Sequence, residues 1–210
     1  MANLGKSDIR VNHVFRENPV FDNIFKSDNA LQMTVNAGAI GLGCGGIHWI
    51  DLALYLSNSK SGKLISGKLD SVPIASGRGK QFRDYGGNGL FEFEDGSTLF
   101  LNVSAESSAN PVCVITQNHC QLVVDLSNGI FVHEREEGLV HPNYLYGKGY
   151  HSHKASNLSS IGPSEQTRLW LQHAKGDRRS KLPTLDEAVI GHELLFDLLE
   201  TGGTRKFLFT

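Results

Sequence analysis

Short apolar segments follow one another through the middle of the chain, with turn residues between them. Segments 90–93 and 99–103 flank the tetrapeptide Glu-Asp-Gly-Ser, and Asp-Gly is a strong signal for a tight hairpin turn. Three more segments, 112–116, 122–126 and 130–133, have the same strand-forming composition. Because these five predicted strands lie close together in the sequence, we expect them to form an antiparallel sheet.

Further strands are predicted on either side of this group. In 31–36 the apolar residues stand at every second position, which is typical of a strand with one buried face. Segments 9–15, 63–72 and 206–210 are the other strand candidates.

Four segments carry helix signals. A short helix is expected at 18–25, because this segment opens with asparagine and a first-turn proline. Helices are also expected at 47–56, after a glycine-rich turn, and at 163–174. The last helix begins after Thr184, which forms a capping box with Glu187. Its broad buried face is predicted to carry Leu185, Ala188, Val189, His192, Leu195, Phe196 and Leu199.

This order of elements predicts an α+β fold. We expect one open, largely antiparallel mixed sheet with helices packed on one face. The 210 residues are enough to bury a core, and we expect them to form a single domain. The other face of the sheet then needs a cover. A homodimer or a larger homo-oligomer formed through that face would provide it.

Residues 134–162 lack the period of a helix or a strand. A loop of this length in a compact domain is usually functional or mobile. Tyr144 and Tyr146 lie in it, and tyrosines could line a carbohydrate pocket because each offers a flat apolar face and a hydroxyl. A loop that packs its tyrosines on the sheet is the alternative. His151 and His153 have no obvious third ligand, so we expect no metal site.

The composition is that of an ordinary globular protein. The chain is 40% hydrophobic with a net charge of −2, which argues against a disordered chain and against a nucleic-acid-binding surface. The three cysteines contain no Cys-x-x-Cys pair, so a disulfide framework is not expected. No apolar stretch resembles a signal peptide or a membrane span. These features predict a cytoplasmic protein without a membrane partner.

Segment 41–46 matches the dinucleotide-binding pattern G-x-G-x-x-G. It follows a predicted strand and opens a helix, and Asp70 lies at the end of a second strand. However, the strand before it alternates polar and apolar residues, whereas the parallel strands of a dinucleotide-binding fold are buried on both faces. Bulky residues follow the third glycine, and no second βα unit comes after it. We therefore interpret Gly41–Gly46 as the start of the helix at 47–56.

The same region resembles the second domain of the Gfo/Idh/MocA family, the relatives of glucose–fructose oxidoreductase and inositol dehydrogenase. That domain carries G-x-x-x-D-x-x-x-H-x-x-D and ends the helix with an aromatic residue and leucine. Here His48 and Asp51 match the pattern, Tyr55 and Leu56 match the final pair, and Cys44 stands where the family usually has aspartate. Segments 87–103, 183–200 and 206–210 resemble the family's hairpin, closing helix and final strand.

This resemblance covers nearly the whole chain, but only as far as the C-terminal domain of the family. The sequence has no Glu-Lys-Pro segment and no convincing dinucleotide-binding unit. The resemblance therefore implies that residues 1–210 are a substrate-binding and oligomerisation domain whose N-terminal dinucleotide-binding domain is absent. Either the chain is a fragment, or it is a natural single-domain protein.

By resemblance, His48 is the candidate catalytic acid/base. Oxidation of an alcohol requires loss of the hydroxyl proton, and an imidazole suits that role. An aspartate at position 44 could orient the ring from one helical turn away, but Cys44 cannot do so well unless it is ionised. Asp51 could compensate or be structural. The alternative for His48 is a histidine that only packs in the core or lies on the surface.

Further polar residues lie near the end of the first predicted strand. Asn12 and Arg16, with His13 between them, could face a sugar or an acid. A solvated turn is the alternative for this cluster.

Three functions follow from these observations. The leading hypothesis is the substrate-binding domain of a dehydrogenase that acts on a sugar, a cyclitol or a sugar derivative. The intact protein would use NAD or NADP, whereas this chain alone would bind no cofactor and would be inactive. The second hypothesis is a non-catalytic module that binds a sugar or another protein. The third is a small dinucleotide-binding protein that uses Gly41–Gly46.

Overall fold

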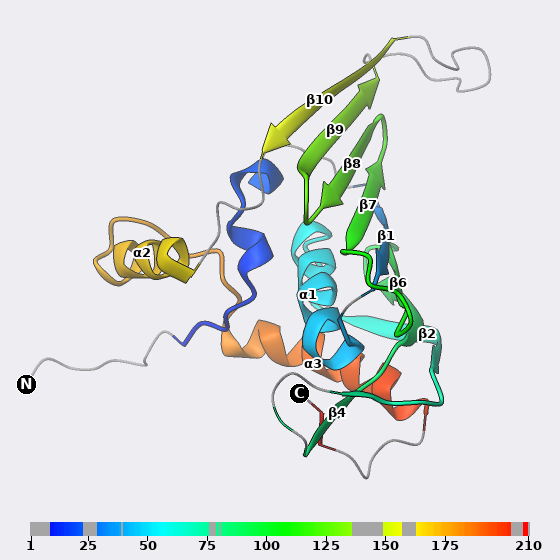
Figure 1. The fold of residues 1–210 in the computed structure, drawn as a ribbon. Helices are drawn as coiled ribbons and strands as arrows, with labels where there is room; N and C mark the ends of the chain where they lie inside the picture. Colours follow the sequence, from blue (N-terminus) through cyan, green and yellow to red (C-terminus); the bar gives the residue numbers. More distant parts are fainter. Residues whose placement is uncertain are drawn as a thin grey trace, which may run out of the picture.

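An open sheet of eight strands forms the centre of the computed structural model, which describes residues 9–22, 29–38, 40–75, 79, 81–135, 149–156, 163–202 and 208–209. The strand order is β10-β9-β8-β7-β1-β6-β5-β2. Strands β1 and β6 are parallel, and every other neighbouring pair is antiparallel. Helices α1 and α3 cover one face of the sheet (Figure 1). The predicted α+β fold class is therefore confirmed.

The strands of the large sheet are β1 Gln32–Ala37, β2 Gly62–Leu69, β5 Gly87–Phe93, β6 Thr98–Val103, β7 Val112–Gln117, β8 Cys120–Asp125, β9 Gly129–Arg135 and β10 Tyr150–Ser156. A small sheet has the order β11-β4-β3, with β3 Ile74–Ala75, β4 Phe82–Asp84 and β11 Leu208–Phe209. The α-helices are α1 Ile47–Leu56, α2 Pro163–Ala174 and α3 Leu185–Glu200. Shorter helical turns are η1 Val14–Glu17, η2 Pro19–Asp22 and the π-helical turn η3 Leu42–Gly46.

Alternation along the strands builds the core. Buried and half-exposed side chains alternate along β5, β7 and β8, as the sequence pattern predicts. Fully buried residues such as Leu99, Leu101 and Ile115 share a core with Trp49 of α1 and Leu198 of α3. Each large apolar side chain buried in this way contributes roughly 1.5–3 kcal/mol. This core fixes the positions of α1 and α3, the two helices that carry the site described below.

The predicted capping box at the start of α3 is present. The hydroxyl of Thr184 accepts a hydrogen bond from the amide of Glu187 at 3.3 Å, and the Glu187 carboxylate accepts one from the Thr184 amide at 2.8 Å. The predicted buried face of α3 is too broad. Leu185, Val189 and Phe196 remain about half exposed, because α3 meets α1 and the sheet only through a narrower stripe of side chains.

Other local predictions need correction. Segment 9–15 is not a strand: Arg10 forms a single bridge with Thr184, and the helical turn η1 begins at Val14. The first part of the predicted helix 18–25 is a 3₁₀ turn, and residues 23–28 lie outside the described part of the chain. Part of the predicted loop 134–162 is strand β10, which pairs with β9. Strand β10 lies at the edge of the sheet with nearly all its side chains exposed, so its sequence shows no alternation.

The three cysteines occupy two kinds of environment. Cys44 is exposed, whereas Cys113 and Cys120 are buried on strands, and all three are free thiols. Burial raises the pKa of Cys113 well above its usual value. Burial, with a smaller effect of the negative charge of Glu134, raises the pKa of Cys120 to about 11. Within the described residues, no helix is long and apolar enough to cross a membrane.

Candidate functional site

The backbone amides of the glycine-rich segment before α1 bind the carboxylate of Asp84. The amides of Gly43 and Cys44 donate hydrogen bonds to the carboxylate of Asp84 at 2.7 and 3.0 Å, and the amide of Tyr85 donates another at 2.8 Å. A Cβ atom added to Gly41 would lie 2.0 Å from Cγ of Asp84, so the absence of a side chain lets this carboxylate approach. In a dinucleotide-binding loop, such amides would face a phosphate.

The topology around this segment also differs from a dinucleotide-binding fold. The strand that follows α1 is β2, which lies at the far edge of the sheet and pairs with β5 antiparallel. A dinucleotide-binding unit needs two parallel strands joined by the helix. Gly41–Gly46 therefore forms the π-helical start of the helix that carries His48, and its residues do not fit a dinucleotide phosphate.

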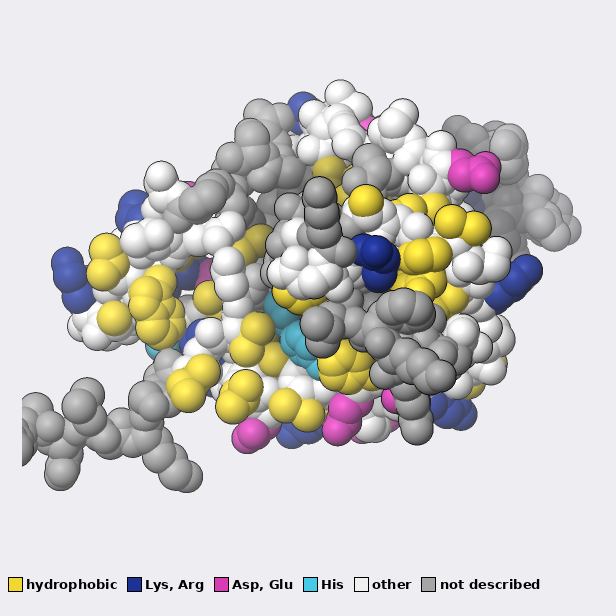
Figure 2. Space-filling view, turned by 60° about the horizontal axis from the view of Figure 1, so that its bottom comes forward, with side chains coloured by type: hydrophobic (Ala, Val, Ile, Leu, Met, Phe, Trp, Pro, Cys, Tyr) yellow, Lys and Arg dark blue, Asp and Glu magenta, His cyan; other side chains and the backbone are white. Residues whose placement is uncertain are grey.

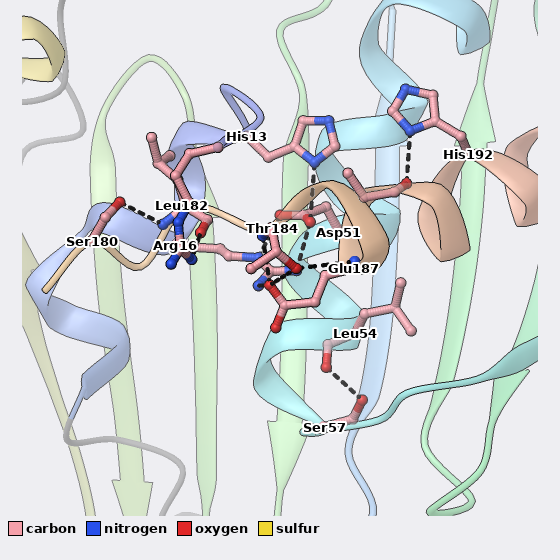
Figure 3. A network of polar contacts seen from close by, with 12 residues as sticks. His13, Arg16, Asp51, Leu54, Ser57, Ser180, Leu182, Thr184, Glu187 and His192 are labelled. Carbon is pink, nitrogen blue, oxygen red and sulfur yellow. Dashed lines mark hydrogen bonds and ion pairs between the residues drawn. The ribbon is translucent and has the colours of Figure 1, made fainter. Parts of the chain in front are cut away.

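A buried polar cluster joins α1 to the N-terminal segment (Figure 3). Arg16 binds the carboxylate of Asp51 through two hydrogen bonds, from Nε at 2.8 Å and from a terminal nitrogen at 2.7 Å. The Nδ1 atom of His13 lies 3.0 Å from Oδ1 of the same carboxylate. The three side chains are nearly excluded from solvent, with exposed fractions of 6% for Arg16, 5% for His13 and 2% for Asp51. Asp51 therefore tethers the N-terminal segment to α1.

Three imidazole rings meet beside this carboxylate. The His13 ring is 5.5 Å from the His48 ring in an edge-on arrangement, and 5.6 Å from the His192 ring in a stacked one. The Nδ1 atom of His192 is 2.8 Å from the carbonyl oxygen of Ala188. Since a carbonyl only accepts, this Nδ1 carries the proton. Nδ1 of His13, although 3.0 Å from the carboxylate, makes no hydrogen bond within the described part of the chain.

His48 occupies the outer side of the cluster. Its ring is half-buried and also lies 5.7 Å from the ring of Phe15, while its Nδ1 atom is buried. On the face that includes α3, histidine side chains reach the surface between apolar side chains (Figure 2).

The structure distributes the other predicted site residues differently. Arg16 and Asp51 are brought together, as described above. Asn12 is exposed and donates a hydrogen bond to Oε1 of Gln166 on α2 at 3.2 Å. It lines a cavity of about 390 Å³ with Trp170 and other residues of α2 and the N-terminal segment. Cys44 is exposed, and Tyr144 and Tyr146 lie outside the described residues.

Sequence reasoning missed two residues that shape the site. His192 was expected only to fill the buried face of α3, although a histidine among apolar helix positions is itself a signal. Asp84 offered no signal, because its contact with Gly43 joins residues that are 41 positions apart. His13 was grouped correctly with Arg16, but its contacts with Asp51 and His48 depend on the way the chain folds back.

A second buried carboxylate anchors the N-terminal segment from the other side. Glu17 accepts hydrogen bonds from the side chain of Arg178, from Oγ of Ser180 at 3.1 Å and from the amide of Lys181 at 3.0 Å. Burial alone would raise the pKa of Glu17. The hydrogen bonds and the charge of Arg178 outweigh burial and hold this pKa below 4.5. The segment that carries His13 is thus held to α1 through Arg16 and to the segment after α2 through Glu17. Within the described residues, no group of three or more His, Cys, Asp or Glu side chains is arranged to hold a metal ion.

Comparison with known proteins shows what this fold is shared with. No protein-family model matches the chain, and no curated protein matches its sequence. Solved structures do match. An oxidoreductase from Thermotoga maritima is similar with a TM-score of 0.61 and 14% identity, over 92% of this chain and 60% of the other.

Two further structures show the range of proteins with this fold. The transcriptional regulator Gal80p from Kluyveromyces lactis has a TM-score of 0.54 and 14% identity, over 95% of this chain and 59% of its own. GenD2 from gentamicin A biosynthesis, solved in complex with NAD, has a TM-score of 0.54 and 15% identity, over 94% of this chain and 58% of its own.

In each case this chain spans less than two thirds of the other protein's length. At these identities the comparisons establish the fold alone. The same fold occurs in other solved structures that are named as oxidoreductases and dehydrogenases. That the chain corresponds only to the C-terminal domain of the Gfo/Idh/MocA family stays a prediction.

Proposed function

We propose that the chain is the substrate-binding and oligomerisation domain of an NAD(P)-dependent dehydrogenase that acts on a sugar, a cyclitol or a sugar derivative. The observation that carries this proposal is the position of His48. Its ring lies at the outer side of a cluster fixed by Asp51 and Arg16, on a fold shared with an NAD-complexed protein.

The chemical step that we assign to this chain is the transfer of one proton. As hydride leaves the carbinol carbon, the hydroxyl proton must leave as well, and Nε2 of a neutral His48 can accept it. A nicotinamide bound by a second domain would accept the hydride. Because the amides of Gly43 and Cys44 are already bound to Asp84, we assign no part of the cofactor to the glycine-rich segment.

The surface beside the histidines supports a second domain on this face. Leu185, Val189 and Phe196 form an exposed apolar stripe on α3, next to His192. Trp170 and Leu171 of α2 are exposed as well. Exposed apolar surface of this kind commonly marks an interface. The longer chains of the similar structures are consistent with a further domain there.

The opposite face of the sheet supports the proposed homo-oligomer. Phe100 on β6 is 39% exposed, and Val114 on β7 and Val123 on β8, which lie in the same cross-strand row, are only half-buried. No helix of the described chain covers this face (Figure 1). We propose that a second copy does. Phe100→Glu should then lower the oligomeric state in sedimentation equilibrium, and a monomeric wild-type protein would contradict this part of the proposal.

The decisive test is turnover by the intact protein. A panel of sugars and cyclitols should be assayed with NAD⁺ and NADP⁺, comparing wild type with His48→Gln. Loss of the acid/base should reduce kcat by about 10²–10⁴-fold. His119→Gln is the matched control, because His119 is exposed at the turn between β7 and β8, away from the cluster. Undiminished turnover by His48→Gln would refute the assigned role.

Binding of the cofactor provides a separate test. In calorimetric titration, we expect no micromolar binding of NADH to this chain alone. Micromolar binding would refute our interpretation of Gly41–Gly46.

A non-catalytic module is the second candidate. It is favoured by Cys44 in place of the family's aspartate, and by the occurrence of the fold in a transcriptional regulator. The same panel separates the two functions: a module would bind a sugar without turnover with either cofactor, and His48→Gln would change affinity only.

A further inference from the structure

We propose that His13 is the positioning residue for His48, held in place by Asp51. This inference rests on the proposed role of His48 and adds a residue to it. His13 is buried and does not reach the surface where a substrate would bind. It can therefore act only through His48.

Asp51 contacts His13 and Arg16. Asp51 follows His48 by three residues on α1, and such residues are neighbours on a helix surface. Its Oδ1 nevertheless lies 3.0 Å from Nδ1 of His13, and both its oxygens bind Arg16. The imidazole oriented directly by a carboxylate is thus His13. The charge of Arg16 balances that of Asp51, and the carboxylate holds His13 through close contact, without a hydrogen bond to its Nδ1.

His13 is packed against the imidazole rings of His48 and His192. Asp51 holds one edge of the ring, His192 stacks on its face at 5.6 Å, and His48 meets it edge-on at 5.5 Å. His192 is itself fixed by its contact with the Ala188 carbonyl. A ring constrained in this way has little freedom to rotate, and side chains locked by packing and hydrogen bonds are what hold a catalytic group in place.

The ring of His48 lies close to two rings of the N-terminal segment. Its ring lies between His13 at 5.5 Å and Phe15 at 5.7 Å, two residues of the same short segment. That segment is anchored by Arg16 to Asp51 and by Glu17 to the segment after α2. The charged groups around the cluster are Asp51 and Arg16, with Glu187 3.8 Å from Arg16. The orientation of His48 is therefore set by a segment that Asp51 fixes through His13 and Arg16.

Two variants separate the ring of His13 from its polar contact with Asp51. His13→Phe keeps a flat ring beside His48 but loses the polar contact. His13→Asn keeps a polar group near the position of Nδ1 but removes the ring. Melting temperatures identify folded variants, and His119→Phe serves as the control for a histidine outside the cluster.

The readout is the state of the His48 ring, measured by long-range ¹H–¹⁵N correlation spectra of protein labelled at histidine. In the wild type we expect His48 in one tautomer. In the two variants we expect the His48 signals to show a mixture of tautomers or exchange broadening, while His119→Phe leaves them unchanged. His48 signals that stay the same in folded His13→Phe and His13→Asn would overturn the proposal.

Turnover, where the panel finds a substrate, supplies a second readout. A misplaced catalytic group can cost on the order of 10²-fold in rate, so we expect kcat of the His13 variants to fall in that range with KM unchanged. Altered His48 signals support the positioning role even if no alcohol is oxidised, a result that would count against the proposed function alone. A change in KM with unchanged kcat would overturn the positioning role.

Discussion

Asp51 and Arg16 form a buried ion pair whose removal should have a large and one-sided effect. The change to make is Asp51→Leu. It leaves the guanidinium of Arg16 buried. Among the described residues, the Tyr55 ring at 5.1 Å and the exposed Glu187 carboxylate at 3.8 Å then offer partial compensation. Breaking a buried pair in this way costs about 3–5 kcal/mol. Because Glu187 offers partial compensation, we expect a loss of about 3 kcal/mol in the free energy of unfolding.

The double variant Arg16→Met with Asp51→Leu tests the reason for that loss. It removes both charges, so no uncompensated charge stays buried, and most of the stability should return. Recovery will be incomplete, because His13 also loses its polar contact with the Asp51 carboxylate. Urea unfolding followed by circular dichroism gives the four free energies of the cycle.

The exposed pair Lys63–Glu92 is the matched control for this cycle. Both its side chains are largely in solvent, so Glu92→Gln should cost less than about 1 kcal/mol. The reasoning fails if Asp51→Leu costs no more than this control, or if the double variant is as unstable as the sum of the two single ones.

Three further outcomes follow from the structure. The hydrogen bonds to Glu17 hold its pKa below 4.5. The stability that they contribute is therefore present above that pH and is lost as the pH falls through the lowered pKa. In urea titrations, Glu17→Gln should be less stable than wild type at pH 7, and the difference should shrink toward pH 3. Of the three thiols, Ellman's reagent at pH 8 should modify only Cys44 rapidly, since the other two are buried with raised pKa values, and a Cys44→Ser protein that still reacts rapidly would contradict this. Gly41→Ala should destabilise the chain by about 1–3 kcal/mol in thermal or urea unfolding, because the methyl group displaces the Asp84 carboxylate, whereas Gly176→Ala, with open space around it, should cost only backbone strain.

Much of the fold could be predicted because its signals are local. The bounds of α1 and α2 and the capping box of α3 follow from residues next to one another in the sequence. The parallel pairing of β1 with β6 could not be predicted in this way. It joins segments 66 residues apart, and neither strand has a sequence feature that identifies the strand it pairs with. Strand β10 was missed for a different reason: an edge strand exposed on both faces has no hydrophobic period to detect.

In the candidate site, too, local features could be predicted from the sequence and long-range contacts could not. His48 and Asp51 were found because they share one helix and one motif, and Arg16 was found by its place in a polar cluster. The partnership between them was not predicted. Asp51 was expected either to compensate for Cys44 or to be structural, and its carboxylate binds Arg16 and lies 3.0 Å from Nδ1 of His13. That choice depends on how the N-terminal segment crosses α1, which is a property of the folded chain.

The glycine-rich segment shows why a local match does not establish a ligand site. Gly41–Gly46 has the pattern, the preceding strand and the following helix of a dinucleotide-binding loop. What decides its role is the carboxylate of Asp84, which is bound to the amides of Gly43 and Cys44. A phosphate would have to displace a carboxylate that makes three hydrogen bonds to backbone amides, and both groups are anions that use the same donors. Under the proposed function, the dinucleotide is therefore held by residues outside this segment.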